Sequence, residues 1–242
     1  MTALFVVAPV FGTREIPAQA KIGLSAVLSL AILPLASPNL PHNLPTSVFE
    51  IAAQLTGEIA IGLMLGFAAS LLFFAVRIGG DIIDFQMGFT QASSFNPEFN
   101  ETISPFANLQ YRYAMVLFLL SGGHWIVLRA LLESFKFLPV SQLVVGMHGV
   151  SAFTDITYAT LVTGLQVAAP GAAVLLITDV AFAFLNRAAP QIQVYYLGMP
   201  VKIVAGLITM AVVLPSLSYV VSQMIISIPV QAQLPLLRAL HR

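Results

Sequence analysis

Few residues of this chain could do chemistry, and the first candidates are ionisable groups beside long apolar runs. Asp179 interrupts one such run, and Arg77 and Asp81 stand near the end of another. Ionisable side chains within apolar membrane segments often mark ion or proton sites. Asp179 is therefore a candidate ion or proton site. The alternative is a carboxylate near a helix end that pairs with Arg187 or with a partner subunit.

The pair Arg77 and Asp81 has a simpler interpretation. Side chains four residues apart lie on one face of a helix, so the spacing predicts a mutual salt bridge at a membrane border. Together with Asp179 and Arg187, these residues form the set of charges that we expect within the membrane or at its edge.

The sequence lacks the residue patterns that are typical of enzymes. It contains no cysteine, which excludes disulfides and thiolate metal sites. None of its four histidines, His42, His124, His148 and His241, stands at metal-ligand spacing from another. A zinc-protease helix motif, a nucleophile elbow and a phosphate-binding glycine loop are all missing from the sequence. We therefore expect no enzymatic activity, no metal and no cofactor.

The composition predicts a membrane protein. Hydrophobic residues make up 58% of 242 positions and charged residues 8%. Soluble domains typically contain about 45–50% apolar residues and about 25% charged residues. So few charged side chains cannot cover the surface of a globular protein of this size in water. We therefore expect lipid or apolar partner subunits to cover much of that surface. The formal net charge is zero, which argues against binding to the phosphates of nucleic acid.

Apolar segments of sufficient length predict an all-α integral membrane protein with five or six membrane-embedded helices. A helix needs about 20 apolar residues to cross a bilayer. The expected segments are Met1–Phe11, Ile22–Leu35, Ile59–Val76 with an extension back to Val48, Tyr113–Leu128, Ile156–Thr178 and Ile203–Leu237. Prolines 215, 229 and 235 are expected to interrupt the last one. We expect broken helical hairpins within a single membrane-embedded unit, residues 1–242.

Two polar connections stand out against this background. Arg77–Gln110 carries acidic, aromatic and proline residues, and its first part could continue a helix as far as Phe89. Asn186–Pro200 is bounded by two prolines. Irregular polar backbone at membrane depth must line water or lie inside protein, so both connections are candidates for function.

Small residues at fourfold spacing indicate close helix packing. Gly62 and Gly66 form one such step, and Gly164, Ala168 and Ala172 form a second. Small residues let helix backbones approach closely in a membrane. We therefore expect a tightly assembled helical body.

A set of short motifs, in order along nearly the whole chain, resembles the FliR family of type III export-gate proteins. The motifs are APVFG at 8–12, IP at 16–17, KIGL at 21–24, EIAIG at 58–62, LGF at 65–67, QMG at 86–88, NRAAPQ at 186–191 and GMPVKI at 198–203. The last two are the most specific. Each motif alone is weak, and their order makes the resemblance strong.

The resemblance implies a function that composition does not reach. Proteins similar to FliR are subunits of the gate that exports unfolded flagellar proteins across the bacterial inner membrane, at the flagellar basal body. The implied partners are FliP-like and FliQ-like membrane subunits, an FlhB-like subunit, unfolded export substrates and the lipid bilayer. The family also has a loop that plugs the closed channel, and it corresponds to the connection at about Ser93–Gln110. The implied plug residues are Phe95, Asn96, Pro97, Ser104, Pro105 and Phe106.

One departure from the family pattern concerns the beginning of the chain. Family members carry a longer apolar helix before the APVFG stretch, and this chain begins seven residues ahead of it. We therefore expect a first helix that is truncated or reduced. Two alternatives to the flagellar gate stay open: the homologous subunit of a virulence (injectisome) export gate, and a secondary transporter that uses Asp179 and Arg77.

Overall fold

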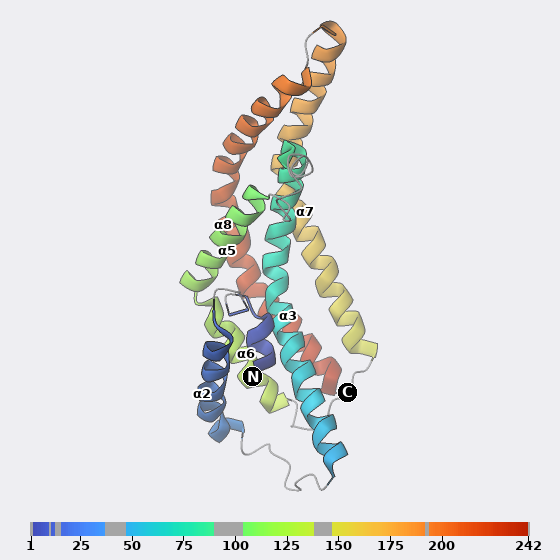
Figure 1. The fold of residues 1–242 in the computed structure, drawn as a ribbon. Coiled ribbons are helices and arrows are strands. Elements are labelled where there is room, and N and C mark those ends of the chain that lie inside the picture. Colours follow the sequence, from blue (N-terminus) through green and yellow to red (C-terminus); the bar gives the residue numbers. More distant parts are fainter. Residues whose placement is uncertain are drawn as a thin grey trace. The chain divides into compact units, whose positions relative to one another are not determined.

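The structure, a computed structural model, describes residues 2–9, 11–12, 16–36, 47–89, 104–137, 147–191 and 194–241. The elements in these residues are all helices (Figure 1). They are α1 Thr2–Val7, α2 Ala18–Ala36, α3 Val48–Met87, α5 Pro105–Leu120, α6 Gly123–Phe137, α7 Met147–Ala188 and α8 Val194–His241. The expected all-α fold is confirmed.

Three of the described helices are long and apolar enough to cross a membrane. They are α3, residues 154–188 of α7 and residues 196–225 of α8. The pair α5 and α6 adds a fourth span if the two are counted together, and residues 18–34 form a shorter apolar helix. The described residues therefore contain three or four candidate spans, fewer than the five or six membrane-embedded helices expected.

The segment expected as one helix around Tyr113–Leu128 is bent in the middle. Helices α5 and α6 meet at 67°. Gly122 lies between them with a φ of +74°, a left-handed conformation that glycine adopts without strain, and its N–H bonds to the Leu119 carbonyl at 3.2 Å. The stretch expected as one apolar segment is thus two helices, because a glycine C-cap ends α5.

Prolines interrupt the helices less than expected. Helix α8 runs without a break through Pro215, and it begins at Val194, six residues before Pro200. Helix α7 likewise contains Pro170. In an apolar setting, unpaired backbone groups are costlier than a local distortion of the helix. The expected breaks in Ile203–Leu237 and the long connection at Asn186–Pro200 are therefore wrong.

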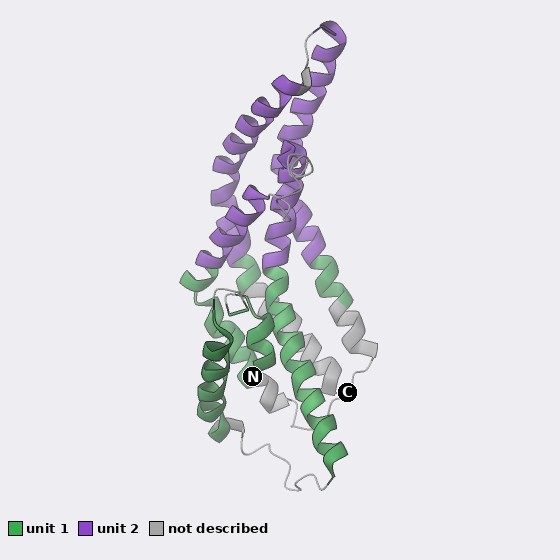
Figure 2. Ribbon diagram, in the orientation of Figure 1, with its two compact units in different colours: residues 1–72, 118–159, 223–242 green, residues 73–117, 160–222 purple. Residues whose placement is uncertain are grey.

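Contacts divide the chain into two compact units (Figure 2). Unit 1 consists of residues 1–72, 118–159 and 223–242, and unit 2 of residues 73–117 and 160–222. Helices α3, α5, α7 and α8 each contribute to both units. The single membrane-embedded unit stays a prediction.

Unit 1 packs the short helix α1 against α2 and α3. Leu4, Phe5 and Ala8 are buried. A Cβ built on Gly62 would lie 3.2 Å from the Ala3 Cβ, and one built on Gly66 would lie 3.0 Å from the Leu4 carbonyl oxygen. Both glycines therefore face α1 and admit its backbone at close range.

Unit 2 is held together by a core drawn from four helices. Ile83, Met87, Phe106, Leu175 and Met210 form one buried cluster, contributed by α3, α5, α7 and α8. Helices α3 and α7 run side by side in the same direction (Figure 1). Two close contacts show this: a Cβ on Gly164 would meet Ile78, and a Cβ on Gly171, further along α7, would meet Ile83, further along α3.

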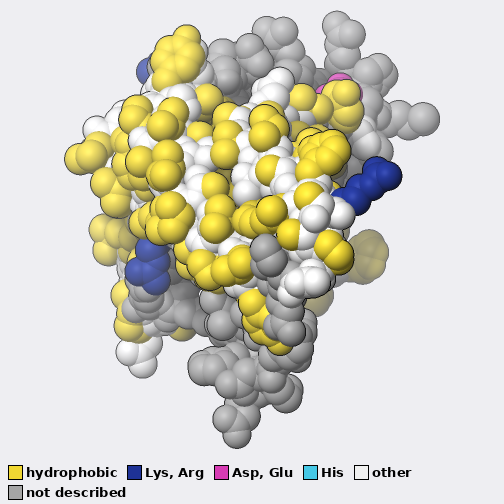
Figure 3. Space-filling model, turned by 90° about the horizontal axis from the view of Figure 1, so that it is seen from above, with side chains coloured by type: hydrophobic (Ala, Val, Ile, Leu, Met, Phe, Trp, Pro, Cys, Tyr) yellow, Lys and Arg dark blue, Asp and Glu magenta, His cyan; other side chains and the backbone are white. Residues whose placement is uncertain are grey.

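Large hydrophobic side chains also cover much of the surface. Leu30, Phe184 and Val212 are each about 70% exposed, and hydrophobic side chains dominate the described part of the face in Figure 3, where charged groups are sparse. A soluble monomer rarely carries so much contiguous apolar surface. This surface agrees with the membrane assignment from composition.

Candidate functional site

The C-terminal end of α3 and the first turn of α5 are joined by a buried carboxylate. Asp84 is fully buried. Its Oδ1 accepts a hydrogen bond from the Phe106 N–H at 3.1 Å, and its Oδ2 accepts one from the Ala107 N–H at 2.9 Å. The first N–H groups of a helix have no partner within the helix, and they carry the positive end of its dipole. Asp84 satisfies two of these groups from another helix.

The local sequence explains why α5 begins where it does. Ser104 precedes the helix, and its carbonyl oxygen accepts the Asn108 N–H at 3.0 Å, which closes the first turn. Pro105 is the first helical residue, where its missing N–H costs nothing and its fixed φ suits a helix. The expected plug residues Ser104, Pro105 and Phe106 thus form a helix start, not an irregular loop.

Further contacts hold α3 and α5 together around the same point. The rings of Phe89 and Phe106 lie 6.4 Å apart between centroids. At Gly80, a Cβ would lie 2.8 Å from the backbone nitrogen of Ala107, so only glycine admits α5 at this distance. The described residues that flank the segment 90–103 are therefore held together in unit 2. The other expected plug residues, Phe95, Asn96 and Pro97, lie outside the described residues.

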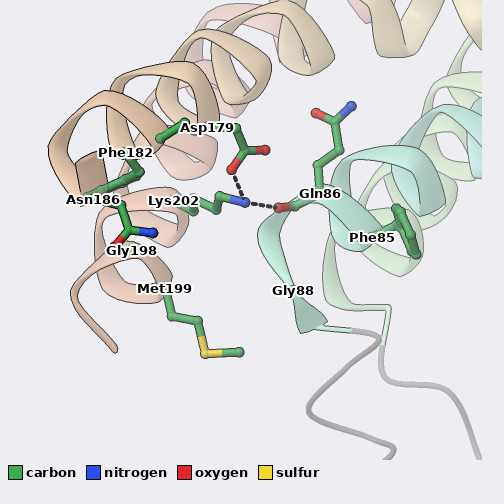
Figure 4. A pocket seen from close by; sticks show the side chains of 10 residues that line it. Phe85, Gln86, Gly88, Asp179, Phe182, Asn186, Gly198, Met199 and Lys202 are labelled. Carbon is green, nitrogen blue, oxygen red and sulfur yellow. Dashed lines mark hydrogen bonds and ion pairs between the residues drawn. The ribbon is translucent and has the colours of Figure 1, made fainter. Parts of the chain in front are cut away.

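A second charged group, Lys202, caps the C-terminal end of α3. Lys202 of α8 forms an ion pair with Asp179 of α7, and its Nζ donates to the Gln86 carbonyl oxygen at 3.3 Å (Figure 4). The last carbonyls of a helix lack internal partners and favour a cation. Gly88, with a φ of +87°, ends the helix two residues later.

A cleft of about 470 Å³ opens beside this ion pair. It is lined by the end of α3, the C-terminal part of α7 and the N-terminal part of α8. The lining combines aromatic, methionine and glycine residues with a few polar groups: Phe85, Gln86, Gly88, Asp179, Phe182, Ala183, Asn186, Gly198, Met199 and Lys202.

The charges predicted from sequence fall into two separate groups. Arg77 Nε lies 3.9 Å from Asp81 Oδ2, with both side chains about half exposed. Asp179 pairs with Lys202, so the suggested pairing with Arg187 is wrong; Arg187 is exposed, and the described residues show no ion pair for it. Arg187 lies two turns beyond Asp179 towards the end of α7, whereas Lys202 returns alongside on α8.

The small residues of the second predicted ladder lie on the α7 face towards α3. A Cβ on Gly164 would lie 3.0 Å from the Ala75 carbonyl oxygen, and Ala168, one turn later, is buried. A Cβ on Gly79 of α3 would lie 2.7 Å from Cγ1 of Val167 on α7. The described residues contain no cluster of three or more potential metal ligands.

Sequence reasoning missed the two residues with the most specific contacts, Asp84 and Lys202. Lys202 stood within the GMPVKI stretch that carried the resemblance, so a functional signal was available. Asp84 was only one of several acidic residues in a polar stretch. Its backbone partners lie 22 and 23 residues further along the chain, and no local spacing indicates such a pair.

Comparisons with known proteins agree on one family. Residues 1–228 match the family described as bacterial export proteins, family 1. The chain is 34% identical over 215 residues to the flagellar biosynthetic protein FliR of Pectobacterium carotovorum, covering 88% of this chain and 80% of that one. It is 31% identical over 214 residues to FliR of Escherichia coli, with the same coverage. It is 30% identical over 161 residues to the secretion system apparatus protein SsaT of Salmonella typhimurium, covering 66% of this chain and 62% of that one.

Proposed function

The chain belongs to the bacterial export proteins of family 1, and from this premise we propose that it is a subunit of the flagellar type III protein export gate. In this role it helps to form and to plug the channel that passes unfolded flagellar proteins across the inner membrane. The role is non-enzymatic. The partners are FliP-like and FliQ-like membrane subunits, an FlhB-like subunit, and the exported polypeptides.

The observation that carries the proposal is that the residues flanking the segment 90–103 are held together in unit 2. A plug must stay attached to the channel wall at both ends if it is to leave the pore and return to it. Here the wall is α3 and α5, and Asp84 ties the start of α5 to α3 through two backbone hydrogen bonds. Phe89 and Ser104 are the described residues on either side of the segment, and the Phe89 ring lies against Phe106 in the first turn of α5.

The composition of the segment suits a plug. It includes Phe95, Asn96, Pro97 and Phe99, a mixture that can fill a passage without forming a regular helix. The exposed apolar surfaces of α2, α7 and α8 support the second part of the proposal, because a gate subunit must cover such surfaces with lipid and with neighbouring subunits.

A deletion within the segment tests the plug directly. Removing residues 93–103 leaves the anchors Asp84, Phe89 and Ser104 in place, and it should make membranes that contain the co-expressed gate permeable to small ions and solutes. A control deletion of residues 38–45, in another connection, should leave the permeability low. Co-purification of the FliP-like and FliQ-like subunits shows whether each gate assembles. Unchanged permeability in an assembled gate that lacks residues 93–103 would remove the plug proposal.

The similarity to SsaT supports one competing assignment, an injectisome gate. Complementation separates the two possibilities. A flagellar subunit should restore motility to a strain that lacks its own FliR, whereas an injectisome subunit should restore secretion to a strain that lacks SsaT. Restored secretion without restored motility would replace the flagellar assignment.

A further inference from the structure

One contact in unit 2 adds a charged link to the apolar packing: α7 and α8 against the C-terminal end of α3, which we call the seam. Along most of α3 the neighbouring helices are packed through glycine and apolar contacts, such as Gly79 against Val167 and Gly80 against Ala107. At the C-terminal end of α3, the Met87 side chain stays in the buried cluster and contacts Gly206 of α8, whereas Phe85, Gln86 and Gly88 line the cleft of about 470 Å³. The α7–α8 hairpin meets α3 there through polar groups.

Lys202 is the link across this seam. Its ammonium group contacts the Asp179 carboxylate on α7 and, at 3.3 Å, the Gln86 carbonyl oxygen on α3, while its own backbone belongs to α8 (Figure 4). One cation thus connects three helices. The contact with α3 is made to a backbone carbonyl in the last turn, where the helix dipole favours a positive charge.

The exposure of these groups sets the link apart from the Asp84 anchor. The Lys202 side chain is 22% exposed and the Asp179 side chain 45% exposed, whereas Asp84 is fully buried. A partly exposed ion pair holds its partners less firmly than a buried one, whereas a buried carboxylate that loses its hydrogen bonds is left uncompensated. The Asp84 anchor is therefore suited to permanence and the Lys202 link to release.

We propose that Lys202 is a positioning residue that latches the α7–α8 hairpin onto the C-terminal end of α3, and that unit 2 opens at this seam when Lys202 leaves the Gln86 carbonyl. The effect on permeability rests on the proposed function, because only a gate subunit would leak when the seam opens. The latch itself does not depend on that function.

The absence of native cysteine allows the latch to be measured by crosslinking. Phe85→Cys on α3 and Met199→Cys on α8 both line the cleft, and a short bismaleimide should join them in assembled gates. The decisive variant is Asp179→Asn with Lys202→Met, which removes both charges at once and leaves neither unpaired. Its crosslinking yield should fall at least about fivefold. Lys202→Arg, which keeps the cation and its donors, should retain the yield.

Arg187→Met is the matched control, because it removes an exposed cation from the same hairpin without touching the seam. Equal yields for the double variant and the unsubstituted pair would overturn the latch, and so would a loss in Lys202→Arg as large as in the double variant. Ion permeability is then measured on the same gates without crosslinker. Leakage together with lost crosslinking supports the effect of the seam on permeability, and lost crosslinking without leakage overturns that effect. The deletion of residues 93–103 tests the plug independently, so failure of one proposal does not imply failure of the other.

Discussion

Substitution of Asp84 by asparagine tests the anchor on which the plug proposal rests. The carboxylate accepts the N–H groups of Phe106 and Ala107 at 3.1 and 2.9 Å. Asparagine offers one acceptor oxygen and turns an NH₂ group towards the other N–H. The first turn of α5 should therefore open more often, and residue 104 should become accessible from water.

The magnitude follows from the two hydrogen bonds. A hydrogen bond to a charged group contributes about 1.5–3 kcal/mol, and Asp84→Asn removes about one such bond. Because about 1.4 kcal/mol corresponds to a factor of ten, the opening equilibrium should rise about 10- to 150-fold. Asp81→Asn, one turn earlier on α3, breaks a half-exposed contact of 3.9 Å. Such a pair contributes at most about 1 kcal/mol, so opening should change by less than about sixfold.

Labelling of a cysteine at position 104 provides the assay. Ser104 is 7% exposed, and Ser104→Cys changes one atom in a chain that has no other thiol. The rate of reaction with a water-soluble maleimide, at low reagent concentration, reports the opening equilibrium. Equal labelling rates in the Asp84→Asn and Asp81→Asn backgrounds would refute the assignment of Asp84 as the anchor of α5.

Two further predictions concern the close helix contacts. Gly80→Ala places a Cβ 2.8 Å from the Ala107 nitrogen, and the overpacking should lower the stability of unit 2 by about 1–3 kcal/mol; Gly23→Ala, which meets nothing within 4 Å, should stabilise α2 by up to about 1 kcal/mol. Opposite shifts of the thermal midpoint are expected, and a drop for Gly23→Ala equal to that for Gly80→Ala would contradict the packing. Ala3→Cys with Gly62→Cys brings two Cβ atoms to about 3.2 Å, close to disulfide geometry, so oxidised membranes should show the bond by gel mobility. Ala3→Cys with Gly23→Cys is the control, and absence of the first bond would exclude the packing of α1 on α3.

The sequence predicted the long helices better than their ends. The charge-free stretch Ile59–Val76, extended back to Val48 and forward towards Phe89, corresponds closely to α3, because hydropathy and backbone pairing decide both. The breaks predicted at the prolines of α8 were wrong, because the environment of a helix determines whether a proline ends it. The bend at Gly122 was missed because an apolar run continues across it, and only the backbone conformation reveals the turn.

The site was predictable in part for a similar reason. Small-residue steps such as Gly62–Gly66 are local patterns, and the structure places both residues against α1. Asp179 was recognised as an unusual charge, but its partner could not be identified, because Lys202 becomes its neighbour only through the turn between α7 and α8. Pairing across a hairpin depends on where the turn lies. The sequence predicted a connection over Asn186–Pro200, whereas α7 ends at Ala188 and α8 begins at Val194.

Both helix-end contacts in unit 2 use charge of the sign that the helix dipole requires. A carboxylate meets the N-terminal end of α5, and an ammonium group meets the C-terminal end of α3. Each charge contacts backbone atoms of the helix that it caps. The side chains at positions 86, 106 and 107 therefore take no part in these contacts. Substitutions at Gln86 that preserve the helix should therefore leave the Lys202 contact intact, whereas no change at Gln86 can replace the charge at 202. Asp84 and Lys202 thus contact the helix ends through backbone groups alone, whereas Asp179 contacts the side chain of Lys202.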